Sequence, residues 1–124
     1  MTGQELVERA EAAAANAYAP YSRYRVGATL VTRDGRLFDG VNVENAAYPL
    51  GVCAERTAIA KAASEGVRPG DVDAIGVTAS PCGGCRQWLH EWRIGAVFFR
   101  RDDGSIAEYA AGDLLPDTWD LPER

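Results

Sequence analysis

The chain has 124 residues, enough for one domain with a sizeable core and too few for two ordinary domains, so we expect a single domain over residues 1–124. Hydrophobic residues make up 47% of the chain and charged residues 25%, values that are typical of globular and not of disordered proteins. The formal net charge of −5, without a basic stripe, argues against a nucleic-acid polymer as partner and favours a small, weakly charged ligand.

The first third of the chain predicts a helix followed by a β-hairpin. Apolar side chains recur at helical spacing over residues 2–17, and Pro20 prevents the helix from continuing. Residues 25–45 then contain two runs of β-forming residues on either side of Asp34-Gly35, a dipeptide that favours a tight turn. We therefore expect the first two strands to pair antiparallel.

The middle of the chain predicts a helix, a buried strand and a further helix. Residues 53–65 are rich in helix formers, and Gly66 is a natural C-terminal cap for that helix. Residues 72–79 form a short, nearly continuous apolar run, as expected of a strand that is covered on both faces. Residues 81–92 indicate another helix.

Two further strands complete the predicted fold. Residues 95–100 and 105–111 flank Asp103-Gly104 as a second hairpin, and a short turn follows at residues 112–116. This order of elements predicts an α/β fold with three layers, α/β/α, in which helices cover both faces of a mixed five-stranded sheet. We expect the third strand to lie parallel to its neighbours, because helical crossovers connect it to them.

The cysteine content and the first residues of the chain bear on its location. An odd number of thiols, here three, cannot pair completely into disulfides, and few thiols are typical of a reducing compartment. Residues 1–18 carry three glutamates and one arginine among alanines and do not form a secretory signal, and no run approaches the roughly 18 apolar residues of a membrane span. We therefore expect a cytoplasmic protein without a membrane partner.

The three thiols are placed as ligands of a catalytic metal ion. Cys53 begins one predicted helix, and Cys82 and Cys85 begin another, where free N–H groups and the helix dipole favour thiolates. Three thiolates on Zn²⁺ leave one tetrahedral position for water, which becomes hydroxide near neutral pH. Glu55 lies in the same first turn and can carry protons, while Arg56 can offset the negative charge of the thiolates.

Two other interpretations of these cysteines remain open. A Cys-x-x-Cys pair such as Cys82 and Cys85 is more often a redox or structural-metal motif than a catalytic one, although a redox pair leaves Cys53 without a role. A non-catalytic module stabilised by zinc needs a fourth ligand, and the only histidine, His90, lies two helical turns beyond Cys82. We expect His90 to be an exposed or hydrogen-bonded helix residue instead.

Four ordered blocks of the sequence resemble the small homotetrameric cytidine deaminases, a zinc-dependent family. The blocks are AYAPYSRYRVGA (residues 17–28), GVNVENAAYPLGVCAERTA (40–58), SPCGGCRQ (80–87) and DLLP (113–116). The resemblance implies a cytidine deaminase-like fold with one Zn²⁺ per chain, held by the three cysteines. It also implies hydrolytic deamination of cytidine and 2′-deoxycytidine in pyrimidine salvage, by a homotetramer with shared active sites.

The resemblance also assigns roles to residues around the metal. It makes Glu55 the proton carrier and Arg56 the residue that neutralises thiolate charge. It places Asn42 and Glu44 at the ribose 3′-hydroxyl; two residues apart on a strand, they project from one face and can together donate to and accept from a sugar hydroxyl. Ala54 joins them among the substrate-binding residues.

At two aromatic positions the chain departs from the usual family pattern. Tyr24 stands where the family usually stacks a Phe on the pyrimidine, and Trp119 stands where a Phe is usually lent to an adjacent subunit's site. Ala46 and Tyr48 match a segment that reaches a neighbouring subunit's pocket, and the stretch before Pro81 is shorter than usual. These differences keep open the same chemistry on a modified cytidine or a blasticidin-type nucleoside antibiotic.

Overall fold

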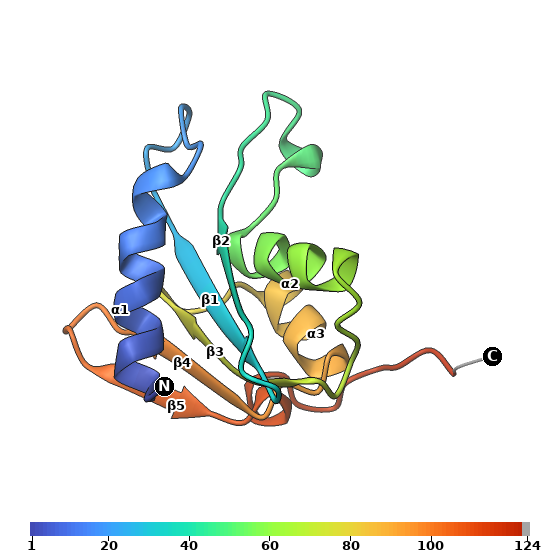
Figure 1. Cartoon of the computed structure of the whole chain (residues 1–124). Coiled ribbons are helices and arrows are strands. Elements are labelled where there is room, and N and C mark those ends of the chain that lie inside the picture. Colours follow the sequence, from blue (N-terminus) through green and yellow to red (C-terminus); the bar gives the residue numbers. More distant parts are fainter. Residues whose placement is uncertain (123–124) are drawn as a thin grey trace.

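Helices and strands follow one another in the predicted order across residues 1–122, which the computed structural model describes (Figure 1). The helices are α1 (Gly3–Ala13), α2 (Ala54–Ser64) and α3 (Gly83–Glu91), with 3₁₀ turns at Ala14–Asn16, Tyr48–Leu50 and Ala111–Leu114. The strands are β1 (Gly27–Thr32), β2 (Leu37–Val41), β3 (Val72–Val77), β4 (Ala96–Arg100) and β5 (Ile106–Tyr109). Within the described residues, no helix combines the length and the apolar character that crossing a membrane requires.

Local sequence signals set the ends of the helices. Thr2 and Glu5 form a capping box at the start of α1, in which each side chain accepts a hydrogen bond from the other residue's backbone N–H. Helix α1 is shorter than the helix predicted over residues 2–17, because the chain tightens into a 3₁₀ turn at residues 14–16. Gly66 follows α2 with a φ of 92°, the left-handed conformation that a C-terminal glycine cap adopts.

The sheet has the strand order β2-β1-β3-β4-β5. Both predicted hairpins are present, since β1 pairs antiparallel with β2 and β4 pairs antiparallel with β5. The prediction that the third strand is parallel to its neighbours is wrong on one side, because β3 is parallel to β4 but antiparallel to β1. The α2 crossover joins β2 to β3, which run in the same direction, and the oppositely directed β1 lies between them.

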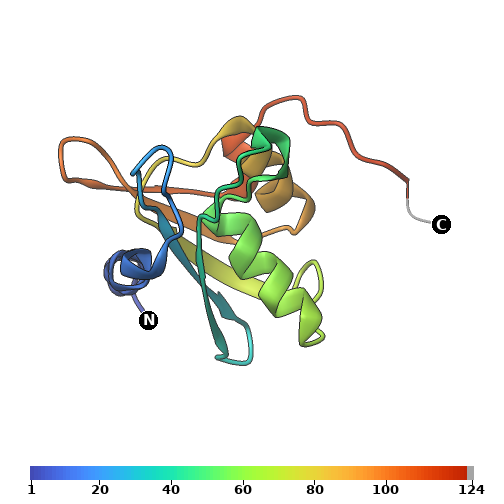
Figure 2. The ribbon, with the colours of Figure 1, turned by 90° about the horizontal axis from the view of Figure 1, so that it is seen from above.

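Helices cover both faces of the sheet, as the predicted three-layer fold requires. Helix α1 packs on one face, mainly against β1 and β3, while α2 and α3 lie on the other side (Figure 2). The main core lies under α2 and α3, and its fully buried side chains include Leu30, Ile59, Ile75, Leu89 and Val97. Burying each such side chain contributes roughly 1.5–3 kcal/mol, so this layer fixes both helices relative to the sheet.

Helix α2 approaches strand β2 so closely that only glycine fits at one strand position. A Cβ atom on Gly40 would lie 2.4 Å from the backbone oxygen of Ala54 and 2.4 Å from the backbone nitrogen of Ala58. Because both are backbone atoms of α2, they cannot retreat unless the helix itself moves. Gly40 therefore allows the start of α2 to lie close to the sheet, and this part of the helix carries Cys53 and Glu55.

An ion pair fastens α1 to strand β2. Asp39 accepts hydrogen bonds from Nε and Nη2 of Arg9, at 3.0 and 3.1 Å, and from the hydroxyl of the buried Thr29, at 2.7 Å. Burial acts to raise the pKa of Asp39, but the hydrogen bonds from Arg9 and Thr29 and the charge of Arg9 outweigh it, so the pKa is lowered. A lowered acid pKa stabilises the folded state at neutral pH, and this contribution is lost as the pH falls through the folded pKa.

We expect Asp39→Asn to lower the free energy of unfolding at pH 7 by about 1 kcal/mol, because the amide loses the charge-assisted hydrogen bonds. The difference from the wild type should shrink as the pH falls below about 3.9, the ordinary Asp pKa. Urea unfolding at several pH values measures both effects, with Asp102→Asn in an exposed turn as the control. Equal destabilisation by the two variants at every pH would contradict the assignment.

Candidate active site

The three thiols meet where helices α2 and α3 begin. Cys53 is the N-cap residue of α2, Cys82 is the N-cap residue of α3, and Cys85 lies in the first turn of α3. Their Sγ atoms all lie within 4.8 Å of one another, and none of the three is in a disulfide. The fold therefore brings the starts of two separate helices to one point.

The spacing of the sulfur atoms fits a tetrahedral zinc ion. Zn–S bonds of about 2.3 Å at the tetrahedral angle place two sulfur atoms roughly 3.8 Å apart, and the Sγ atoms of Cys53 and Cys82 are 3.9 Å apart. Within residues 1–122, the cluster of metal-ligating side chains holds the three cysteines and no fourth residue. His90 is hydrogen-bonded to Thr118 and Asp120 instead, as expected of a helix residue without a metal role. The donor set suits one zinc ion with one open coordination position.

The ionisation of the thiols also favours a cation at this point. Burial raises the pKa of the Cys53 thiol, and burial together with the Glu55 carboxylate raises the pKa of the Cys85 thiol. Burial also acts to raise the pKa of the Cys82 thiol. Hydrogen bonds from the Cys85 backbone N–H and from the neighbouring thiols outweigh burial, so the pKa of Cys82 is lowered. Two of the three thiols therefore resist ionisation by themselves, and a divalent cation is the group that would stabilise all three thiolates.

Arg56 brings a positive charge to the thiols. Its Nη2 atom lies 4.0 Å from the Sγ atom of Cys82, and its buried Nε atom has no hydrogen-bond partner among the described residues. Burial acts to lower the pKa of Arg56, but when the cysteines are ionised, the charge of Cys85, the hydrogen bond to it and the charges of the other two thiolates outweigh burial and raise that pKa. The guanidinium therefore stays charged beside the cluster, which fits the role of neutralising thiolate charge.

Glu55 is a buried acid beside the metal-binding cluster. It lies in the first turn of α2 and is only 3% exposed. Burial raises the pKa of its carboxyl group above the ordinary value. A carboxyl group with a raised pKa exchanges protons more readily near neutral pH, so Glu55 is suited to proton transfer at this site.

A cleft of about 310 Å³ opens onto this group of residues. The residues that line it are Ser22, Tyr24, Val26, Asn42, Glu44, Cys53, Ala54, Glu55, Ala79, Ser80 and Cys82. Most of the residues predicted for catalysis, metal binding and substrate binding thus share one cavity. Its volume lies at the lower end of the range for small-molecule sites, about 300–1,000 Å³, and suits a ligand of nucleoside size.

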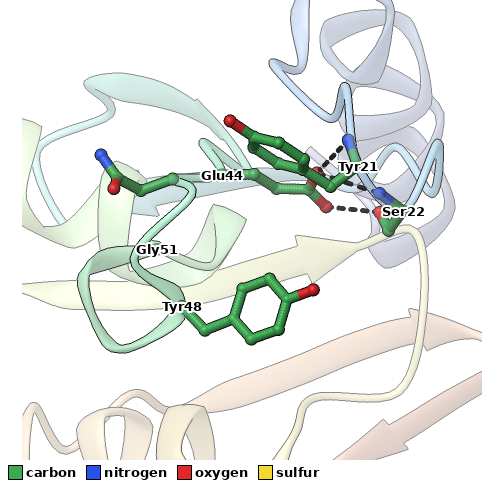
Figure 3. A pocket seen from close by; sticks show the side chains of 6 residues that line it. Tyr21, Ser22, Glu44, Tyr48 and Gly51 are labelled. Atoms are coloured by element: carbon green, nitrogen blue, oxygen red, sulfur yellow. Dashed lines mark hydrogen bonds between the residues drawn. The ribbon is translucent and has the colours of Figure 1, made fainter.

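Asn42 and Glu44 lie in the wall of the cleft and also hold the loop that carries Tyr24. The Nδ2 atom of Asn42 donates a hydrogen bond to the backbone oxygen of Tyr24 at 2.8 Å. Glu44 accepts hydrogen bonds from the backbone N–H groups of Tyr21 and Ser22 and from the Ser22 hydroxyl (Figure 3). The hydrogen bond from the Ser22 hydroxyl is the main cause that lowers the pKa of Glu44, so this carboxylate is charged at neutral pH.

Three of the predicted substrate-binding residues do not line the cleft. Tyr48 is 81% exposed and lines a neighbouring cavity of about 260 Å³, and Ala46 is exposed in the same loop. Trp119 is 70% exposed, and its backbone oxygen accepts a hydrogen bond from Gln87 at 3.4 Å. Their roles in a neighbouring subunit's site stay predictions.

Three polar residues at the site were not singled out from the sequence. Ser22 and Ser80 line the cleft, and Arg86 holds the loop that precedes Cys82. The Arg86 guanidinium donates hydrogen bonds to the Ser80 hydroxyl at 3.0 Å and to the Pro81 carbonyl oxygen at 2.9 Å. It also donates to the Leu114 carbonyl oxygen at 3.1 Å. All three lie inside the sequence blocks that resemble cytidine deaminases, and this position was the one sequence signal that could have pointed to them.

Comparison with known proteins matches this chain to deaminases. A family model described as "Cytidine and deoxycytidylate deaminase zinc-binding region" matches residues 1–101. The chain is 45% identical over 124 residues to the cytidine deaminase of Halalkalibacterium halodurans, covering 94% of this chain and 92% of the relative. It is 40% identical over 115 residues to the cytidine deaminase of Mycobacterium tuberculosis, covering 90% of this chain and 84% of the relative.

Solved structures give the same result. The crystal structure of cytidine deaminase from Burkholderia pseudomallei superposes on this chain with a TM-score of 0.89 at 47% identity. The match covers 96% of this chain and 100% of that chain. The cytidine deaminase structure from Mycobacterium tuberculosis has a TM-score of 0.82 at 36% identity, covering 98% of this chain and 99% of that one. Together with the three-cysteine zinc site, these matches show that the chain belongs to the zinc-dependent cytidine and deoxycytidylate deaminase family of enzymes.

Proposed function

We propose that the chain catalyses the hydrolytic deamination of cytidine and 2′-deoxycytidine to uridine and 2′-deoxyuridine, with release of ammonia, as a step of pyrimidine salvage. The observation that carries the proposal is the cleft in which Glu55 and two of the three metal-binding cysteines share one cavity with Asn42 and Glu44. Such a cavity combines a hydrolytic centre with polar groups that can bind a sugar. Membership of the deaminase family supports the reaction.

Glu55 moves the protons in this reaction. Zinc held by the three cysteines supplies a Lewis acid that lowers the pKa of water into the neutral range. Glu55 takes the proton that water loses as its oxygen bonds to C4 of the pyrimidine, and passes that proton to N3. It then takes the remaining proton from the new C4 hydroxyl and delivers it to the amino group, which leaves as ammonia. The product keeps a C4 carbonyl and a protonated N3, so atoms and charge balance.

The other residues of the cleft bind and orient the nucleoside. Asn42 and Glu44 hydrogen-bond the sugar hydroxyl, and Tyr24 offers an aromatic face to the base. Ala54 also lines the cleft and adds only an apolar side chain. Arg56 offsets the negative charge of the thiolates, which would otherwise weaken the acidity of the metal site.

Metal-replete protein should convert cytidine and 2′-deoxycytidine to the uridines, followed by the change in ultraviolet absorbance. We expect one zinc per chain by elemental analysis, loss of activity on chelation and recovery when zinc is added back. The absence of turnover with both nucleosides would contradict the proposal. A parallel panel of cytosine, base-modified cytidines and blasticidin tests the substrate, because faster turnover of one of these would reassign it.

We propose further that the active enzyme is a homotetramer with shared active sites. Tyr48 and Trp119 support this, since both are large aromatic residues that are mostly exposed and lie outside the cleft of their own chain. Sedimentation equilibrium measures the assembly directly. A monomer that retains full activity would contradict shared sites.

We place the enzyme in the cytoplasm. The three cysteines must stay reduced to hold a metal ion, and a reducing compartment provides that condition. Cell fractionation with antibody detection tests the location.

A further inference from the structure

We propose that Ser22 is a positioning residue that couples recognition of the sugar to the placement of Tyr24 in the cleft. The inference rests on the proposed function, because it concerns how the same cleft holds a nucleoside. Ser22 lines the cleft of about 310 Å³ at the metal site. It also lines the neighbouring cavity of about 260 Å³ that Tyr48 borders (Figure 3). Its side chain therefore lies at the boundary between the two cavities.

The Ser22 hydroxyl links Glu44 to the backbone of Tyr24. It donates a hydrogen bond to Glu44 Oε2 and accepts one from the Tyr24 N–H at 3.0 Å. The other carboxylate oxygen, Oε1, accepts from the N–H groups of Tyr21 and Ser22 at 3.0 and 3.1 Å. One loop thus holds both oxygens of the carboxylate, and the carboxylate holds the loop.

Asn42 fixes the same loop from the other side. Its Nδ2 atom donates to the Tyr24 backbone oxygen at 2.8 Å, and its Oδ1 atom accepts from the Val26 N–H at 2.8 Å. The predicted sugar-binding pair therefore holds both backbone polar groups of Tyr24. Asn42 binds the carbonyl directly, and Glu44 is linked to the N–H through the Ser22 hydroxyl. A shift of either member of the pair displaces the aromatic residue that faces the base.

These hydrogen bonds limit what the pair can still bind. A carboxylate offers about four acceptor sites, and Glu44 already uses three of them in the loop. The Asn42 amide has one of its N–H donors engaged with Tyr24. A single sugar hydroxyl that donates to Glu44 and accepts from Asn42 would use the remaining acceptor site of the carboxylate and the remaining N–H donor of the amide. Ser22 thus restricts Glu44 to one hydroxyl and holds it in the orientation that reads that hydroxyl.

The variant Ser22→Ala tests this on cytidine and on 3′-deoxycytidine, which lacks the hydroxyl. Loss of the Ser22 hydroxyl removes the hydrogen-bond partner of Glu44 Oε2 and of the Tyr24 N–H, so we expect kcat/KM for cytidine to fall about tenfold, mainly through KM. The ratio of kcat/KM for cytidine to that for 3′-deoxycytidine should fall by roughly threefold or more. Ser22→Thr, which keeps a hydroxyl, should restore the ratio. Ser64→Ala is the matched control, because that hydroxyl bonds to the Ala60 carbonyl within α2.

A second readout does not depend on activity. Hydrogen exchange at the Tyr24 amide should be about tenfold faster in Ser22→Ala than in the wild type, because that amide loses its acceptor. Equal losses on both substrates together with unchanged exchange would overturn the inference. If the wild type turns over neither substrate, the proposed function fails, and the exchange rate still decides whether Ser22 positions Tyr24. Should Ser22→Ala not fold, Ser22→Cys, a similar volume with a weak hydrogen-bonding group, takes its place with the same expected results.

Discussion

Glu55→Gln should abolish turnover while leaving zinc in place. Glutamine fills the same buried volume but cannot accept a proton and pass it on. General acid–base catalysis typically contributes about 10²–10⁴-fold, and Glu55 serves in successive proton transfers, so we expect kcat to fall by about 10⁴-fold. Steady-state kinetics on metal-replete protein measures the loss, and elemental analysis measures the zinc content of the same sample.

The matched control for this substitution is Glu65→Gln. Glu65 ends the same helix, α2, and its exposed side chain is remote from the N-terminal turn where Glu55 lies. We expect the control to retain wild-type kcat and zinc. Retention of more than about a tenth of the activity by Glu55→Gln would show that Glu55 is not the proton carrier. Loss of zinc from that variant would show instead that Glu55 contributes to holding the metal.

Gly40→Ala should damage both the fold and the active site. The added methyl group would lie 2.4 Å from two backbone atoms of α2, those of Ala54 and Ala58, and no side-chain rotation relieves that overlap. Overpacking of this kind costs about 1–3 kcal/mol, and we expect a loss in the free energy of unfolding at the upper end of that range. Since α2 carries Cys53 and Glu55, its displacement should also reduce kcat/KM by about 100-fold.

Gly112→Ala separates the close contact from a general effect of replacing glycine. A Cβ atom at Gly112 meets nothing within 4 Å, and this residue is not among the glycines with positive φ. We expect its stability to stay within about 0.5 kcal/mol of the wild type. Denaturant unfolding of both variants, with zinc content, gives the comparison. Equal stability of Gly40→Ala and the control would mean that α2 accommodates the methyl group without cost.

Local signals in the sequence are sufficient to place the helix starts that form the metal site. Cys53 and Cys82 are the N-cap residues of α2 and α3, where the helix-forming runs and their flanking turns predict them. The hairpins follow for the same reason, because Asp34-Gly35 and Asp103-Gly104 are turn signals between neighbouring strands. Each of these predictions depends on residues that are close together in the chain.

The direction of β3 relative to β1 could not be obtained in this way. A crossover helix predicts that the strands at its two ends run in parallel, and β2 and β3 do so. It does not predict which strand lies between them, and the structure places β1 there. That choice depends on packing between residues far apart in the chain, such as Leu30 and Ile75, which are partners in the β1–β3 register.

The sequence by itself determined the chemistry of this protein: three thiols at helix starts, a glutamate in the first helical turn, and the blocks of a deaminase. Residue type and short spacing are enough for this, because ligand chemistry and helix caps are local properties. Only the tertiary structure decided how the cleft is held together. It joins Glu44 and Asn42 to the loop of Ser22 and Tyr24 through hydrogen bonds that span about twenty residues of sequence. No local pattern encodes such pairs, because their partners become neighbours only when the sheet and helices pack.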